Sequence, residues 1–142
     1  MFSFTEPGEA ADEHERLLAI EERILTELEI PYRVVEVAVG DLGASAARKF
    51  DCEAWIPSQE RYRELTSCSN TTDYQARRLN SRYRPAEGEA PQVLHTLNGT
   101  AVAVGRTIIA IAENHQREDG TIEIPAPLHP FGAPATISAA GA

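Results

Sequence analysis

The chain has 142 residues, of which 42% are hydrophobic, and it carries a formal net charge of −9. This length suffices for one globular domain with a hydrophobic core, and the acidic balance argues against a non-specific nucleic-acid binder. The two cysteines, Cys52 and Cys68, form no CxxC pair and indicate neither a disulfide framework nor a zinc site. Because no apolar run reaches membrane length and no signal peptide opens the sequence, we expect a cytoplasmic protein without a membrane partner.

Strand and helix signals alternate along the first half of the chain. Between Glu9 and Glu29 the apolar residues recur at helical spacing, with acidic residues on the outer face, and Pro31 ends the helix. The patterns predict a strand over 1–5, a helix over 9–29, a strand over 32–39, a short helical segment over 44–49 and a strand over 51–56.

Strands outnumber helices in the second half. The patterns predict strands over 61–69, 92–96, 101–104 and 121–124, a helix over 71–78 capped by Asn70 or Thr71, and a helix opened by Arg106 over 107–112. Since the last helix is apolar on every side, we expect it to be buried. The whole chain predicts one α+β domain over 1–142, an antiparallel sheet flanked by helices, with a frayed tail over 133–142.

Charge is unevenly distributed along the chain. Residues 1–30 hold nine acidic and two basic side chains, net −7, whereas residues 61–84 hold six arginines against two acidic residues, net +4. An arginine-rich strand in an acidic chain favours a specific anionic ligand over a general polyanion surface.

Three polar groups are candidates for chemistry. Arg106 can bind phosphate through its planar guanidinium or stack on a flat ring, and the equally weighted alternative is that it caps a neighbouring carboxylate. Glu64 and Ser67 offer hard-oxygen ligands suited to Mg²⁺, although this spacing alone is a weak signal. Asp51 and Glu53 share a strand face, and we expect them to pair with Arg61 or Arg63 rather than to hold a metal.

Three long segments carry a family resemblance. The run TLNGTAVAVGRTIIAIAENHQ, from Thr96 to Gln116, resembles the third signature motif of class II aminoacyl-tRNA synthetases in the form found in bacterial-type seryl-tRNA synthetases. RYRELTSCSNTTDYQARRLNSRYR, from Arg61 to Arg84, resembles the strand that precedes that motif, and VGDLGASAARKFDCEAWIPSQ, from Val39 to Gln59, is similar to the same family. The matches are in order, correctly spaced and cover nearly the whole chain.

The resemblance implies a partial class II catalytic core that uses ATP to activate serine and transfers it to tRNA(Ser). It implies that Glu64 and Ser67 hold the Mg²⁺ that bridges the ATP phosphates. Asn98 and Thr100 would line the serine pocket, and Arg106 would pack against the adenine ring and reach the phosphates. Arg106 and Glu64 are thus the expected catalytic residues.

The chain departs from that family in one large respect. Seryl-tRNA synthetases begin with a coiled-coil arm that grips tRNA, followed by a first motif at the homodimer interface and a second motif that supplies an arginine, an aromatic ring and a glutamate. None of these is present, so the chain looks like the C-terminal part of the catalytic domain, from after the second motif through the third. We therefore expect it to be inactive without the missing N-terminal half. The alternatives are a non-catalytic remnant that binds a nucleotide or a partner protein, and an amino acid–carrier protein ligase.

Overall fold

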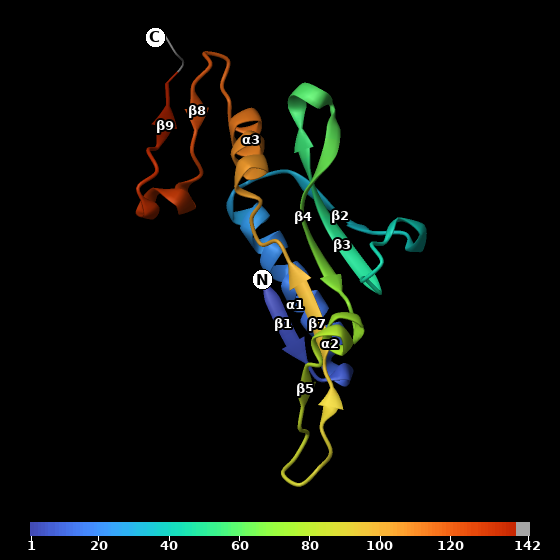
Figure 1. Ribbon diagram of the computed structural model, residues 1–142. Coiled ribbons are helices and arrows are strands. Elements are labelled where there is room, and N and C mark those ends of the chain that lie inside the picture. Colours follow the sequence, from blue (N-terminus) through green and yellow to red (C-terminus); the bar gives the residue numbers. More distant parts are fainter. Residues whose placement is uncertain (139–142) are drawn as a thin grey trace.

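A five-stranded sheet organises the computed structural model, which describes residues 1–138 (Figure 1). The strand order is β1-β7-β4-β3-β2, and every neighbouring pair is antiparallel. The five strands are β1 (Phe2–Thr5), β2 (Tyr32–Glu36), β3 (Arg48–Ile56), β4 (Arg61–Asn70) and β7 (His95–Gly99). The predicted α+β class with an antiparallel sheet is confirmed.

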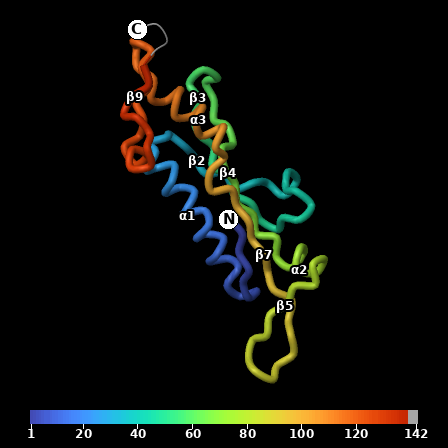
Figure 2. Tube along the Cα trace, turned by 60° about the vertical axis from the view of Figure 1, so that its left-hand side comes forward, coloured from blue at the N-terminus to red at the C-terminus, as the bar shows by residue number. Residues whose placement is uncertain are grey.

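Helix α1 (Ala10–Glu27) covers one face of this sheet (Figure 2). Its stripe of leucines, including Leu17 and Leu25, is buried against the strands. On β3 the predicted alternation is confirmed, because Cys52, Ala54 and Ile56 point into this core while the residues between them are half-exposed. Each fully buried leucine stabilises the fold by about 1.5–3 kcal/mol, so the α1 face forms the core and the opposite face remains for polar groups.

Smaller elements surround the sheet. Helix α3 (Val104–Asn114) follows β7, and helix α2 (Tyr74–Leu79) packs on the same strand. Two short hairpins extend from the body, one formed by β5 (Arg82–Tyr83) and β6 (Gln92–Val93) and the other by β8 (Ile122–Glu123) and β9 (Thr136–Ile137). None of the helices in the described part of the chain is long and apolar enough to cross a membrane.

The apolar run 101–104, all of it within the described residues, does not form the predicted strand. Strand β7 ends at Gly99, the last residue paired with β4, and the Thr100 amide still donates to Ser67 O over 2.9 Å. The chain then bends, and α3 begins at Val104. The run leaves the edge of β4 after Thr100 and pairs with no strand among the described residues, so its apolar composition alone does not make it a strand. Arg106 consequently lies inside the first turn of α3 rather than at its start.

The expectation that this helix is buried all round is also wrong. Thr107, Ala110 and Ile111 face the core, but Ile108 is 61% and Ile109 52% exposed. Helix α3 meets the body of the protein at the end of the sheet and contacts mainly β3. One side of the helix is therefore covered by the chain, and the other presents apolar side chains that composition predicted to be buried.

Three local predictions also need correction. The segment 44–49 is not helical, because Arg48 and Lys49 already belong to β3. Helix α2 begins at Tyr74 and no side chain caps it in the described structure, since the Asn70 Oδ1 atom accepts instead from the Thr72 amide. In the tail expected to be frayed over 133–142, β9 pairs with β8, and residues 139–142 lie outside the described residues.

The exposed face of α3 predicts that the isolated chain self-associates. Replacing Ile108 with glutamate should lower this association, measured by sedimentation velocity, because it removes apolar surface at an exposed position. The stability of Ile108→Glu should stay within about 0.5 kcal/mol of the parent. As the matched control, Ile111→Glu places the carboxylate in the core and should destabilise the chain by about 3 kcal/mol or more. A monodisperse, monomeric parent chain would contradict the prediction.

Candidate functional site

A β-bulge in β4 creates the polar face of the sheet. Cys52 is opposite Thr66 and Glu53 is opposite Glu64, so the register between β3 and β4 skips Leu65. Leu65 and Thr66 are consequently both buried, although adjacent strand residues ordinarily face opposite sides. A regular alternation would put Glu64 and Thr66 on the same side of β4, and the bulge separates them.

The bulge has a direct consequence for the two candidate metal ligands. Two residues three positions apart in a regular strand point to opposite faces. Here Glu64 aligns with Glu53 and Ser67 aligns with Asp51, and these two partners lie on the same half-exposed side of β3. Glu64 and Ser67 are thus on one face, opposite the face that α1 covers.

The same register brings β7 into the site. Ser69, two residues beyond Ser67 on β4, pairs with Asn98 on β7, so Asn98 lies on this face as well. Thr100 follows at the end of β7, where its amide is bonded to the Ser67 carbonyl. The strands therefore place Glu64, Ser67 and Asn98 on one side of the sheet, with Thr100 at its margin.

Four of the five candidate residues line one hollow. Its lining consists of Glu64, Leu65, Thr66, Ser67, Thr100, Ala103 and Arg106. Asn98 does not line this hollow and lies farther along the same face, beside Ser69. A second hollow adjoins it on the α3 side. Arg106 and Glu64 line this hollow too, together with residues that include Arg63 and Ile109. The residues that the sequence separates by up to 42 positions are thus brought together between β4, the end of β7 and α3.

The contacts of Arg106 test one of its two predicted interpretations. Its Nη1 atom donates to the backbone carbonyl of Glu64 over 3.0 Å, and within residues 1–138 the guanidinium takes part in no ion pair. The carboxylate-capping alternative is therefore wrong. A guanidinium has five N–H donors in a fixed plane, so the contact with Glu64 orients Arg106 and leaves donors for an anionic ligand.

Lys49 is a site residue that sequence reasoning missed. Its Nζ atom lies 2.7 Å from Asp51 Oδ1 and 3.5 Å from Glu64 Oε1. Asp51 therefore pairs with Lys49, and Glu53 pairs with Arg33 at 2.6 Å, rather than either pairing with Arg61 or Arg63. The alternation of β3 was the available signal, because it places Lys49 on the face of Asp51 and Glu53. Lys49 supplies the positive charge that keeps two carboxylates close together on this face.

The donor set of the face fits a magnesium ion that arrives with its own oxygen ligands. The described residues contain no group of three His, Cys, Asp or Glu side chains that could hold a metal ion. Mg²⁺ is, however, commonly held by one or two carboxylates together with substrate phosphates and water. The Glu64 carboxylate and the Ser67 hydroxyl, which line the same hollow, fit this pattern.

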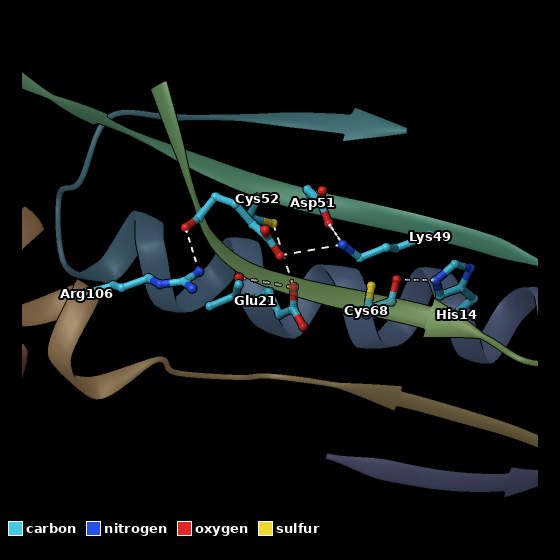
Figure 3. Close-up of polar contacts among 9 residues, drawn as sticks. His14, Glu21, Lys49, Asp51, Cys52, Cys68 and Arg106 are labelled. Atoms are coloured by element: carbon cyan, nitrogen blue, oxygen red, sulfur yellow. Dashed lines mark hydrogen bonds and ion pairs between the residues drawn. The ribbon is translucent and has the colours of Figure 1, made fainter. Parts of the chain in front are cut away.

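A buried carboxyl lies beneath the site, on the other side of the sheet. Glu21 projects from α1 toward the strands and is 0% exposed (Figure 3). Its Oε2 atom accepts from Thr66 Oγ1 at 3.1 Å and from Cys52 Sγ at 3.8 Å. Burial raises the pKa of Glu21 to about 7, an effect that these hydrogen bonds only partly oppose. Sequence reasoning placed the acidic residues of α1 on its outer face; the available signal was that Glu21 lies four residues from both Leu17 and Leu25, on the buried stripe.

Comparison with known proteins identifies the fold. The family model of the tRNA synthetase class II core domain (G, H, P, S and T) matches residues 1–115. The chain belongs to this family. Its class II core is similar to the crystal structure of seryl-tRNA synthetase from Pyrococcus horikoshii complexed with ATP, with a TM-score of 0.94 and 50% identity over 96% of this chain and 31% of that one. A second similar structure is that of the cytoplasmic serine–tRNA ligase from Naegleria fowleri in complex with AMP, with a TM-score of 0.90 and 37% identity. That match covers 99% of this chain and 34% of the Naegleria chain.

The curated proteins of similar sequence are also serine–tRNA ligases. The serine–tRNA ligase of Rubrobacter xylanophilus is 61% identical over 131 residues, and that of Acidothermus cellulolyticus is 63% identical over 131 residues. In both comparisons the match covers 92% of this chain and 31% of the relative. The chain therefore spans about a third of the length of these ligases, and the predicted resemblance to part of a seryl-tRNA synthetase is confirmed.

The raised pKa of Glu21 predicts a pH-dependent stability. The folded chain favours the neutral carboxyl, so the associated stability is present below the ordinary pKa of 4.5 and is lost as the pH rises to about 7. Glu21→Gln cannot ionise and should be more stable than the parent at pH 8, by up to about 3 kcal/mol, and nearly equal at pH 4.5. Urea unfolding of the parent and of Glu21→Gln, at low protein concentration and at both pH values, measures these free energies of unfolding. Parallel stability–pH curves for the two proteins would contradict this assignment.

Proposed function

We propose that this chain forms the part of a serine–tRNA ligase that holds the ATP phosphates and the serine substrate. The complete enzyme would use ATP to activate serine and would transfer the seryl group to tRNA(Ser). The observation that carries the proposal is the single hollow lined by Glu64, Ser67, Thr100 and Arg106. The serine–tRNA ligases of similar sequence support it, as do the complexes of two similar structures with ATP and AMP.

Arg106 is proposed to bind ATP. Its contact with the Glu64 carbonyl orients the guanidinium, and its remaining donors are free to reach phosphate oxygens while its plane packs on the adenine ring. Fixed positive charge at this position stabilises the negative charge that develops when the serine carboxylate attacks the α-phosphate. Arg106 is therefore the proposed catalytic residue of α3.

Glu64 and Ser67 are proposed to hold Mg²⁺ together with the ATP phosphates. The bound ion would neutralise phosphate charge during the reaction. The β4 bulge places both side chains on the site face, and Lys49 holds the Glu64 carboxylate toward Asp51 until a ligand binds. Glu64 is the second proposed catalytic residue because it would position the phosphates through this ion.

Asn98 and Thr100 are proposed to bind serine. Strand β7 carries Asn98, and Thr100 is the residue directly after its end. The Thr100 amide donates a hydrogen bond to the carbonyl of Ser67 on β4. A site that offers hydrogen bonds to a small hydroxyl group rejects amino acids without one, because its polar groups would remain unpaired. A serine pocket at this position, beside the proposed metal ligands, would suit attack of the serine carboxylate on ATP.

The remaining partners belong to the complete enzyme. The chain spans 31% of its bacterial relatives, and we propose that the rest supplies the other catalytic motifs, the arm that binds tRNA(Ser) and the homodimer interface. Strand β1 is at the edge of the sheet, and its Phe2 and Phe4 side chains are exposed, which suits pairing with further strands of such a domain. The cytoplasm is the location that accords with this activity.

The role of Arg106 can be tested in a hybrid synthetase, in which this chain replaces the segment it matches in the Rubrobacter xylanophilus ligase. The hybrid should catalyse serine-dependent ATP–pyrophosphate exchange, whereas the isolated chain should not exceed background. Arg106→Ala should lower kcat/KM of the hybrid about 10²–10³-fold because a charge at the reacting phosphate is lost. Arg23→Ala removes an arginine that pairs with Glu27 on the outer face of α1 and should leave the rate unchanged. Exchange that depends on another amino acid would overturn the assignment of serine.

The metal role predicts a distinct effect for Glu64. Glu64→Gln in the hybrid should raise the Mg²⁺ concentration needed for half-maximal exchange by about tenfold or more, because an amide oxygen is a weaker ligand than a carboxylate. Glu53→Gln alters the neighbouring carboxylate that pairs with Arg33 and serves as the matched control. A magnesium titration at saturating ATP separates the two variants. If both variants need the same Mg²⁺ concentration as the parent for half-maximal exchange, Glu64 is not a metal ligand.

A further inference from the structure

The proposed reaction leaves one buried polar group without a role. Glu21 comes from α1 and lies across the sheet from the hollow, so it cannot touch a ligand bound there. Its Oε1 atom is buried and finds no hydrogen-bond partner among the described residues. Within residues 1–138 Glu21 also takes part in no ion pair. A carboxyl in such a place is energetically unfavourable, and a leucine would fill the same stripe of α1.

The contacts of Glu21 join the two strands that carry the site. One oxygen accepts the hydroxyl of Thr66, which directly precedes Ser67 on β4. The other lies against Gly99 on β7, where an added Cβ atom would be 2.8 Å from Glu21 Oε1 and 2.9 Å from Cys68 Cβ. Gly99 separates Asn98 from Thr100. A single side chain therefore supports both the proposed metal-binding strand and the proposed serine-binding segment from below.

The sheet itself couples these two segments. The Thr100 amide donates to the Ser67 carbonyl over 2.9 Å, at the point where β7 leaves the sheet. Cys68 and Gly99 are the last aligned pair before that departure. A shift of β7 relative to β4 would therefore move Asn98 and Thr100 relative to Ser67, and Glu21 lies against the residues on both sides of this junction.

We propose that Glu21 is a positioning residue for the serine subsite, which fixes the position of residues 98–100 relative to β4 through its contacts with Thr66 and Gly99. This inference rests on the proposed function, because it assigns serine to Asn98 and Thr100. It also explains why Gly99 lacks a side chain at this position, since the carboxyl and Cys68 occupy the space a Cβ would need. Arg106 is oriented independently by the Glu64 carbonyl, and Ser67 is held by its pairing with Asp51 on β3. Residues 98–100 lie where β7 leaves β4, so the effect of Glu21 falls on serine more than on ATP.

Kinetics of the hybrid synthetase test the proposal. Glu21→Leu keeps the volume but removes the acceptor for Thr66, and it should raise the KM for serine about tenfold while the KM for ATP changes less than about threefold. Glu21→Gln keeps both shape and acceptor and should retain the parent values. Thr66→Val removes the other half of the hydrogen bond, should reproduce the effect of Glu21→Leu, and should add little to it in the double variant. Glu22→Leu removes the adjacent carboxyl, which bonds to Tyr32 instead, and should leave the KM for serine unchanged.

Hydrogen exchange in the 142-residue chain provides a readout that does not depend on activity. Glu21→Leu should accelerate exchange of the amides of residues 98–100, and Glu21→Gln should restore their protection. Unchanged hydrogen exchange in Glu21→Leu would overturn the positioning role, as would equal rises of both KM values, because the effect would then not be specific to serine. If the parent hybrid lacks serine-dependent exchange, the proposed function fails, and hydrogen exchange still decides whether Glu21 positions residues 98–100.

Discussion

The site depends on one irregularity in the sheet, the bulge at Leu65. In a regular strand Glu64 and Ser67 would point away from each other, one into the α1 core and one toward the open face. The bulge adds one residue to β4 at this point, so both side chains reach the open face while Leu65 and Thr66 remain buried. Bulges commonly occur beside active sites because they re-aim side chains without ending the strand pairing. Without the bulge at Leu65, the hollow would lose either the Glu64 carboxylate or the Ser67 hydroxyl.

The two faces of the sheet perform different tasks. The α1 face provides the free energy of folding through buried apolar side chains, and the open face gathers Lys49, Asp51, Glu64 and Ser67. Glu21 is the exception on the apolar face, because it brings a carboxyl into the core directly beneath the site. Both cysteines lie nearby as free, buried thiols, and burial raises the pKa of each to about 12. They therefore remain protonated and act as small apolar residues of the core.

Helix α3 connects the site to surface that the chain does not cover. Arg106 faces the hollow, whereas Ile108 and Ile109 on the same helix are more than half exposed. The edge strand β1 adds Phe2 and Phe4 to the exposed apolar surface. These features suit a chain that spans about a third of the ligases it resembles. The proposed partner for such surface is the remainder of a class II catalytic domain.

The sequence by itself determined the elements whose signals are local. The helical stripe that includes Leu17 and Leu25, the alternation along β3 and the motif that contains Arg106 predicted α1, the antiparallel sheet and the family. It predicted neither the end of β7 at Gly99 nor the exposure of α3, because these depend on which strand or surface is available as a neighbour. Only the tertiary structure decided that Glu64 and Ser67 share a face, that Lys49 joins them and that Glu21 lies beneath, since a one-residue shift of register reverses the face of every side chain that follows.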